Sequence, residues 1–246
     1  MLSTTPRTQI RLRSLRQFYN LLDGLEQRLG GKRRLRDCNG RAGWPKRGVY
    51  FFFEESELRS DSGDGLRVVR IGTHALRRGS RTSLWHRLAQ HRGIAKSGGG
   101  NHRGSIFRLL VGTALIQREP TFVSESWGKG NTAPREVRLG EHDLECQVSN
   151  VIGQMPFLWL SIPDEAGPDS LRGVVERNTI ALLSNYDRQT LDPPSNTWLG
   201  RNCSRVRVRR SGLWNNNHVD EVHDPAFLDI FERLVFNTGE IEKWRV

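Results

Sequence analysis

Three short stretches of the sequence carry side chains of the types that cleave phosphodiester bonds. They are Tyr50 in "RGVYFFFEE" (47–55), Arg87 and His91 in "SLWHRLAQH" (83–91), and Glu176 in "GVVERNTIALL" (173–183). A tyrosine or histidine can take a proton from an attacking water, an arginine can hold a phosphate, and a carboxylate can hold a divalent cation. Residues of these types can carry out in-line hydrolysis of a phosphate diester if the fold brings them together.

Each of these residues also has a purely structural interpretation. Tyr50 precedes three phenylalanines and can be a packed strand aromatic. Arg87 and His91 stand one helical turn apart and can form the solvated face of an amphipathic helix. Glu176 lies beside the apolar pair Val174–Val175 in a helix that otherwise looks buried. A carboxylate there needs a cation as its partner, either a metal or one of the many arginines.

Hydrophobic periodicity predicts the elements that position these residues. Apolar residues recur at spacings of three and four from Leu15 to Leu29, which predicts a helix with Ser14 as N-cap and Gly30–Gly31 as its stop. Two β-rich runs, 48–54 and 66–73, flank a polar turn-forming segment and are typical of a hairpin. Further patterns predict a helix at 83–91, a β-type run at 105–116, a strand at 157–162, a helix at 169–186 capped by Asp169 or Ser170, and a final helix at 224–236 that begins with Asp224 and Pro225.

Positive charge is concentrated in parts of the chain, whose net charge is +11. Residues 1–47 hold twelve Lys or Arg against three acids, whereas residues 119–192 hold six against twelve. Arginine predominates over lysine, and its planar guanidinium suits bidentate contacts with phosphate. The charge therefore favours nucleic acid as the partner over an anionic membrane or a merely solvated surface.

The composition also excludes several classes of protein. No run approaches eighteen apolar residues, and the N-terminus lacks the apolar segment of a secretion signal. The three cysteines, Cys38, Cys146 and Cys203, form no CxxC pair, which argues against a disulfide framework and against a zinc ribbon. We therefore expect a cytoplasmic protein with free thiols and no membrane partner.

Two basic segments are typical of nucleic-acid contacts. No acid occurs between Pro193 and Val219, so this segment can follow a phosphate backbone while Trp and Asn side chains face bases. The alternatives are a β-hairpin with packed tryptophans here, and a packed helix with a solvated basic tail at the N-terminus. The predicted DNA-binding residues are Arg201, Arg205, Arg207, Arg209, Arg210, Trp214, Asn215, Asn216, Asn217 and His218, with Lys32, Arg33 and Arg34 in the N-terminal arm.

The order of these motifs resembles that of the GIY-YIG nuclease family over roughly residues 48–190. Gly48, Val49 and Tyr50 stand where the family has GIY, and Arg70, Ile71, Gly72 and Thr73 stand where it has YIG followed by Ser or Thr. The resemblance implies that Arg87 and His91 are the family's helical Arg and His, and that Glu176 is its metal-holding Glu.

The chain departs from the family pattern at three places. Arg70 replaces the first tyrosine of YIG, which removes one of the family's two active-site phenols. The segment "HALRRGSRTS" (74–83) is an enlarged loop before the first helix. The asparagine that family members place after the Glu has two candidates, Asn185 and Asn196.

Together these observations predict an α/β (α+β) fold in which a small antiparallel β-sheet of about three strands is flanked by helices, as in GIY-YIG proteins. The predicted nuclease core spans 48–190 and carries an insertion at about 117–155. Residues 1–47 form an N-terminal helix and basic arm, and residues 191–246 form a C-terminal basic extension and the final helix.

The predicted function is that of a metal-dependent endonuclease acting on DNA. Tyr50, with His91, activates water, Arg87 clamps the phosphate, Arg70 adds positive charge, and Glu176 binds Mg²⁺, for which Mn²⁺ is a substitute. No other small-molecule cofactor is indicated. The alternatives are a nucleic-acid-binding module that has lost catalysis, motivated by Arg70, and a ribonuclease.

Overall fold

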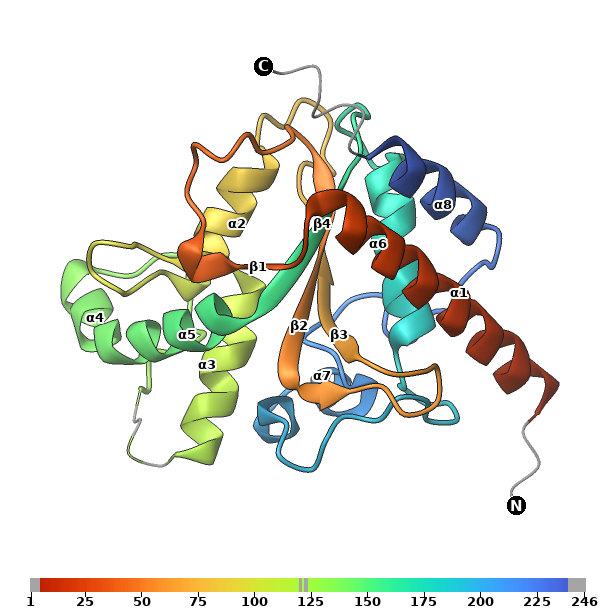
Figure 1. The fold of residues 1–246 in the computed structure, drawn as a ribbon. Helices are drawn as coiled ribbons and strands as arrows, with labels where there is room; N and C mark the ends of the chain where they lie inside the picture. The colour runs from red at the N-terminus through yellow and green to blue at the C-terminus, as the bar shows by residue number, and fades with distance from the viewer. Residues whose placement is uncertain (1–4, 120, 122–123, 239–246) are drawn as a thin grey trace.

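Two layers of helices cover the two faces of a central sheet in the computed structural model (Figure 1). It describes residues 5–119, 121 and 124–238, and these contain eight α-helices and four strands. The strands are β1 (Arg33–Arg34), β2 (Gly48–Leu58), β3 (Leu66–Gly72) and β4 (Pro156–Ser161), and the antiparallel sheet has the order β1-β4-β2-β3. The helices are α1 (Pro6–Leu29), α2 (Leu84–Arg92), α3 (Ile106–Arg118), α4 (Arg135–Gly140), α5 (His142–Gln154), α6 (Leu171–Leu183), α7 (Val206–Ser211) and α8 (Phe227–Asn237).

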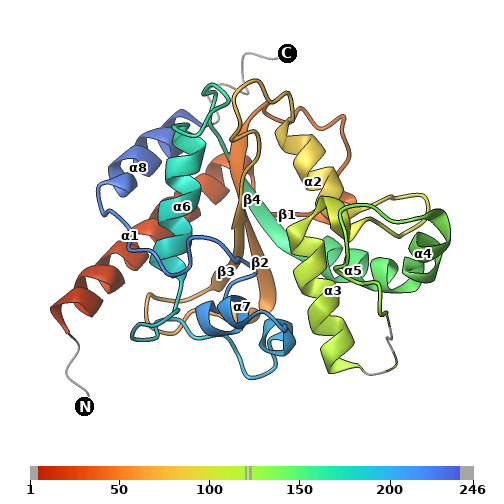
Figure 2. The same ribbon diagram turned by 180° about the vertical axis from the view of Figure 1, so that it is seen from behind.

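The run of aromatic residues in β2 is explained by burial on both faces. Val49, Phe51 and Phe53 belong to a core cluster with residues of α1, α6 and α8. Tyr50 and Phe52 point to the opposite face and join a second cluster with residues of α2, α3 and α5. Figure 2 shows the two helical layers on either side of the sheet. A strand that is covered on both faces reads as continuously apolar, since its side chains alternate between two cores.

The predicted α/β class is confirmed, and so is the hairpin. β2 and β3 pair antiparallel with Tyr50 opposite Gly72, and β4 forms at the strand expected for 157–162. The sheet has a fourth strand, β1, within the segment that the sequence predicted as a basic arm. It is only two residues long and pairs Arg33 with Phe157, which is too short to show a periodic pattern.

The β-type run predicted at 105–116 is wrong, because these residues form helix α3. Ser105 caps the helix by accepting a hydrogen bond from the backbone N–H of Arg108 at 3.3 Å. The buried side chains recur at helical spacing; they are Phe107, Leu110, Val111, Ala114 and Leu115. A short apolar run does not distinguish a buried strand from a buried helix by periodicity.

The boundaries of three helices differ from the sequence prediction, and one of them is α6, which ends at Leu183 and not at Tyr186. α1 begins at Pro6 with Thr5 as N-cap, so Ser14 lies inside the helix. The extra turns carry Arg11, a buried side chain that donates to the backbone carbonyls of Leu182 and Ser184 at 2.9 and 2.8 Å. It thereby satisfies carbonyls at the end of α6, which have no partner within the helix. At the other end of the chain, α8 begins at Phe227, after the predicted Asp224–Pro225 start.

The segment expected as an insertion at 117–155 contains helices α4 and α5. α5 contributes Leu144, Val148 and Ile152 to the second core cluster. No helix among the described residues is long and apolar enough to cross a membrane.

A buried ion pair joins α5 to α3. Arg108 is fully buried, and its Nε donates to Glu145 Oε2 at 2.9 Å. The same guanidinium donates to the carbonyl of His91 at 2.8 Å, at the end of α2. Burial alone would raise the pKa of Glu145, but the hydrogen bond from His102 and the charge of Arg108 lower it overall. The pair therefore stabilises the protein at neutral pH, and this stabilisation is lost as the pH falls through the lowered pKa.

We predict that Glu145→Ala lowers the free energy of unfolding by about 3 to 5 kcal/mol, because it leaves a buried arginine without its partner. Urea denaturation of this variant beside Glu232→Ala, an exposed glutamate of α8, measures the difference. A loss below about 1 kcal/mol at Glu145 would contradict the assignment of this pair as a structural link.

Candidate active site

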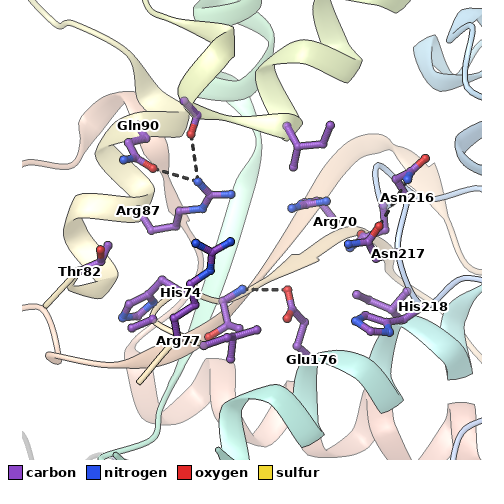
Figure 3. A pocket seen from close by; sticks show the side chains of 17 residues that line it. Arg70, His74, Arg77, Thr82, Arg87, Gln90, Glu176, Asn216, Asn217 and His218 are labelled. Carbon is purple, nitrogen blue, oxygen red and sulfur yellow. Dashed lines mark hydrogen bonds between the residues drawn. The ribbon is translucent and has the colours of Figure 1, made fainter. Parts of the chain in front are cut away.

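A pocket of about 680 Å³ lies where the end of β3, α2, α6 and the segment 215–218 meet (Figure 3). Among the described residues that line it, three arginines stand against a single carboxylate, Glu176. The other polar side chains of the lining are His74, Gln90, Asn215, Asn216, Asn217 and His218, with Thr73 and Thr82, and the arginines are Arg70, Arg77 and Arg87. The excess of positive charge suits an anionic ligand.

Glu176 projects from α6 into this pocket (Figure 3). Its Oε1 accepts a hydrogen bond from the backbone N–H of Thr73 at 3.1 Å. In the part of the chain that the structure describes, no hydrogen bond engages the second oxygen, Oε2. Burial raises the pKa of Glu176, while Arg70, His218, the Thr73 hydrogen bond and Arg87 act in the opposite direction. The structural alternative, an ion pair with an arginine, is not formed within the described residues.

Glu176 is the single carboxylate among the described residues that line the pocket, so a metal held there by a carboxylate would bind to Glu176. The described residues contain no group of three or more His, Cys, Asp or Glu side chains able to hold a metal ion. Mg²⁺ is commonly held by one or two carboxylates, with waters and substrate phosphates as its other ligands. One carboxylate with an unengaged oxygen fits this kind of site.

Arg87 is held over the pocket by two acceptors. Its Nη1 donates to Gln90 Oε1 at 2.9 Å, within α2, and to the carbonyl of Gly104 at 3.2 Å (Figure 3). The side chain is half-buried, and its other guanidinium nitrogens make no hydrogen bond to described residues. These donors remain for a phosphate.

Arg70, at the position of the YIG tyrosine, is buried at the other side of the pocket. Its Nη1 donates to the carbonyl of Trp214 at 2.6 Å. Its Nε is buried and has no hydrogen-bond partner among the described residues. The guanidinium thus adds charge to the pocket and at the same time contacts the C-terminal part of the chain.

Tyr50 and His91, the two residues expected to act together on water, form a hydrogen bond. The Tyr50 hydroxyl and His91 Nε2 are 2.7 Å apart, and His91 Nδ1 is 2.7 Å from Ser105 Oγ. Both Tyr50 and His91 are fully buried, and neither lines the pocket. The phenol lies against Gly72, where a Cβ atom would be 2.2 Å from its oxygen. The residue after Gly72, Thr73, lines the pocket. The backbone at Gly72 therefore separates the Tyr50 hydroxyl from the pocket.

The electrostatics link this pair to the pocket. Burial lowers the pKa of His91 well below its usual value, and the charges of Arg87, Arg70 and Arg108 lower it further. The imidazole is therefore neutral at pH 7 and has one donor and one acceptor nitrogen for its two partners. The positive charges of Arg70 and Arg87 therefore act on the Tyr50–His91 pair from the pocket.

His74 is a second neutral histidine in the wall of the pocket. Burial, with Arg172 nearby, lowers its pKa to about 4. Its Nε2 is 3.3 Å from the carbonyl of Lys46, and its Nδ1 is buried without a partner in the described residues. His74 lies in a loop without periodicity, so no pattern in the sequence points to a role for it.

Neither asparagine that was expected to complete the site lies in it. Asn185 is buried and pairs with Leu191, whose N–H and carbonyl are both 3.0 Å from the amide. It also accepts from Arg11, so its donors and acceptor stabilise a turn after α6. Asn196 is exposed and outside the pocket. The amides that do line the pocket are those of Asn215, Asn216 and Asn217.

The tryptophans of the C-terminal segment do not face a nucleic acid. Trp198 and Trp214 are buried, and their indole N–H groups donate to Glu54 Oε1 at 3.1 and 2.8 Å. The expectation that Trp214 faces bases is therefore wrong, because its ring belongs to the second core cluster. The alternative of a β-hairpin is also wrong, since residues 206–211 form α7.

Most of the arginines predicted for DNA in this segment already have partners. Arg207 pairs with Asp220 at 2.7 Å, and Arg210 pairs with Asp187. Arg209 donates to the carbonyl of Cys203, and Arg201 donates to that of Ser195 at 2.7 Å. Arg205 precedes α7 as its N-cap residue. The acids that neutralise this segment lie outside it in the sequence, which is why its own composition did not reveal them.

The N-terminal basic arm lies at the sheet edge opposite the pocket. It forms β1, whereas the pocket lies at β3 on the other edge. Lys32 pairs with Glu26, Arg34 pairs with Glu55, and Arg33 stacks over Trp159 at 4.8 Å. These contacts favour the structural interpretation of Lys32, Arg33 and Arg34 over a role beside the pocket.

Comparison with known protein families agrees with this arrangement of hairpin, helical arginine and helical glutamate. The model of a family described as a GIY-YIG domain matches residues 9–241. The chain belongs to the GIY-YIG family. No curated protein and no solved structure matches the chain significantly.

Membership of this family implies a nuclease, and hence a hydrolase, at the level of the family. GIY-YIG nucleases act on DNA and generally use divalent metal ions. The matched region extends well beyond the motifs at 48–190 and includes most of α1 and all of α8.

Proposed function

We propose that this protein is a divalent-metal-dependent endonuclease that hydrolyses phosphodiester bonds of DNA. The observation that carries the proposal is the position of Glu176, whose unengaged oxygen shares one pocket with Arg70 and Arg87. A carboxylate beside several cations is the arrangement needed to hold a metal and a phosphate together.

Glu176 is the proposed ligand of Mg²⁺ or Mn²⁺. When bound, the divalent cation supplies positive charge for the phosphate and the leaving oxygen. Arg87, oriented by Gln90 and Gly104, holds the phosphate through its free donors. Arg70 adds a second positive charge across the pocket.

Tyr50 is the proposed acceptor of the proton of the attacking water, and as it takes this proton it passes its own hydroxyl proton to Nε2 of the neutral His91. Their hydrogen bond of 2.7 Å supports this role. The phenol lies behind Gly72, so a water reaches it only after a small movement of this wall when substrate binds. Hydrogen bonds of catalytic groups are often completed only in the complex with substrate.

Three nucleic acids distinguish this function from its alternatives. We expect supercoiled plasmid to be cut in the presence of Mg²⁺ or Mn²⁺, while an RNA of similar length stays intact. A single-stranded DNA run in parallel defines the strandedness of the substrate. Binding of plasmid without cleavage in either metal would favour the inactive binding module, and cleavage restricted to RNA would favour the ribonuclease.

A basic loop beside the pocket is the proposed contact for flanking phosphates. Arg77, Arg78 and Arg81 of the loop 74–83 are exposed, and no hydrogen bond or ion pair holds their side chains within the described residues. Lys46 and Arg47 lie beside Arg78 and Arg81 around a second pocket of about 600 Å³.

We predict that replacing Arg77, Arg78 and Arg81 by Ala weakens duplex binding and flattens the slope of log K against log salt by about 0.9 for each lost phosphate contact. The matched control replaces Arg207, Arg209 and Arg210, whose guanidinium groups already have partners in the protein. Titrations by fluorescence anisotropy at several salt concentrations measure both slopes. A larger change of slope in the control than in the loop variant would indicate that DNA contacts the C-terminal segment and not the loop.

A further inference from the structure

The segment 214–218 adds to the free edge of the sheet. β3 is an edge strand, and the backbone N–H of Trp214 donates to the carbonyl of Val69 on it at 2.7 Å. The side chain of Asn215 then pairs with both backbone groups of Ile71, at 3.1 Å to its N–H and 2.9 Å to its carbonyl. Edge strands expose unpaired backbone groups, and these contacts engage them.

Arg70 fixes the same segment from the side of the sheet. Its Nη1 donates to the carbonyl of Trp214 at 2.6 Å, and the side chain is only 5 % exposed. A tyrosine at this position would have a single hydroxyl on a rigid ring. A guanidinium has five N–H donors where tyrosine has one O–H, so the arginine that replaces the family's tyrosine can donate to the C-terminal segment and still present donors to the pocket.

Docking of this segment brings His218 into the pocket beside Glu176 (Figure 3). His218 adopts a left-handed backbone conformation with φ of 63°, which is unusual for a residue with a side chain. Its Nδ1 is 2.7 Å from Glu221 Oε1, and Glu221 also pairs with Arg177. The imidazole is 33 % exposed, and its Nε2 has no hydrogen-bond partner among the described residues.

Two features distinguish His218 from an ordinary surface histidine. Residues in sparsely populated backbone conformations persist only where the surroundings hold them, and they concentrate at functional sites. The carboxylate of Glu221 orients the ring, so that Nε2 is the ring nitrogen left for a ligand. A neighbouring pocket of about 840 Å³ is also lined by Glu176 and His218. His218 therefore lies between this pocket and the candidate active site.

We propose that the segment 214–218 completes the substrate site in place of the missing YIG tyrosine. Arg70 and Asn215 are the residues that position this segment. His218 is the residue that contacts a phosphate of the nucleic acid, next to Glu176. The proposal rests on the nuclease function proposed above. In its imidazolium form His218 carries a proton on both ring nitrogens, so Nε2 donates to the phosphate while Nδ1 donates to Glu221.

Single-turnover cleavage of a labelled DNA duplex in saturating Mg²⁺ tests the role of His218. We expect His218→Ala to cut about ten- to a hundredfold more slowly, and His218→Gln, which keeps a donor, to recover part of the rate. His142→Ala is the matched control, because His142 lies at the start of α5 and outside the pocket. A rate for His218→Ala equal to that of the control would overturn the contact.

Arg70→Tyr tests the positioning role, because the two interpretations of this residue predict opposite results. If the family's tyrosine were simply missing, restoring it would raise the rate of cleavage. We expect instead a loss of at least about tenfold, together with faster hydrogen exchange of the amides of residues 214–218. Arg70→Lys, which keeps a positive charge and a donor, should recover part of the rate and of the protection.

Hydrogen exchange keeps this test independent of the proposed nuclease activity. If the parent cut no DNA at all, the proposed function would fail, while exchange would still report whether Arg70 docks the segment. Asn215→Ala provides a second variant, with faster exchange expected in the same amides. Unchanged exchange in both variants, or a faster nuclease in Arg70→Tyr, would overturn the proposal.

Discussion

Glu176→Gln is expected to slow cleavage of duplex DNA in Mg²⁺ by at least about a thousandfold, while binding of the duplex survives or becomes tighter. The amide keeps the shape of the side chain but removes the charge that would hold the metal, whose stabilisation of the transition state is on the order of several kcal/mol. It also removes a negative charge that repels phosphate in a pocket lined by Arg70, Arg77 and Arg87. Single-turnover cleavage and anisotropy with the same labelled duplex measure the two effects.

Stability separates this effect from misfolding. Burial raises the pKa of Glu176, so the folded protein binds a proton at this site more tightly than the unfolded chain does. The ionised carboxylate therefore costs stability above the raised pKa, and this cost disappears below the ordinary value. We expect the melting temperature of Glu176→Gln at neutral pH to equal or exceed that of the parent. Glu232→Gln, at an exposed position on α8, is the control for the substitution itself. Parent-like cleavage by Glu176→Gln would show that this carboxylate holds no essential metal.

Tyr50→Phe is expected to slow cleavage by at least about a hundredfold, the usual scale for removing a general base. The ring and its packing in the second core cluster remain, but the hydroxyl that contacts His91 is lost. The same change leaves a buried nitrogen of His91 without a partner, so we also expect a loss of about 1 to 3 kcal/mol in the free energy of unfolding.

Tyr19→Phe is the matched control for this prediction. Tyr19 is likewise buried, lies on the opposite face of the sheet, and accepts a hydrogen bond at its hydroxyl from the N–H of Val68 at 3.1 Å. We expect a similar loss of stability there and parent-like cleavage. If both variants cut at the same rate as the parent, Tyr50 would be a packing residue, and the role of proton acceptor would pass to another group.

The elements that position the site could largely be predicted from the sequence, because their signals are local. The hairpin of β2 and β3, the strand β4 and the cap of α6 at Ser170 each depend on residues within one short stretch. Helix α3 was mistaken for a strand because its apolar residues are nearly continuous, and its buried Arg108 is explained only by Glu145 on another helix.

The composition of the pocket depended on contacts between distant parts of the chain. Glu176 and Arg87, which line the pocket, can be predicted because each lies in a helix with a motif, whereas only distance along the sequence from Glu176 points to Asn185. The asparagines that line the pocket belong to the segment 214–218. Hydrogen bonds hold this segment to β3: Asn215 bonds to Ile71, 144 residues away in the sequence, and Trp214 bonds to Val69. The pairing of Arg207 with Asp220 likewise could not be read from a segment that contains no acid itself.

Dependence of DNA cleavage on a divalent metal tests the central claim most directly. The purified protein is first stripped of metal with EDTA, and supercoiled plasmid is then incubated with it while Mg²⁺ is added in increasing amounts. The account predicts no cleavage in EDTA and nicked or linear plasmid once free Mg²⁺ is in excess. Cleavage that proceeds equally in EDTA, or plasmid that stays supercoiled at every concentration of Mg²⁺ and Mn²⁺, would contradict it.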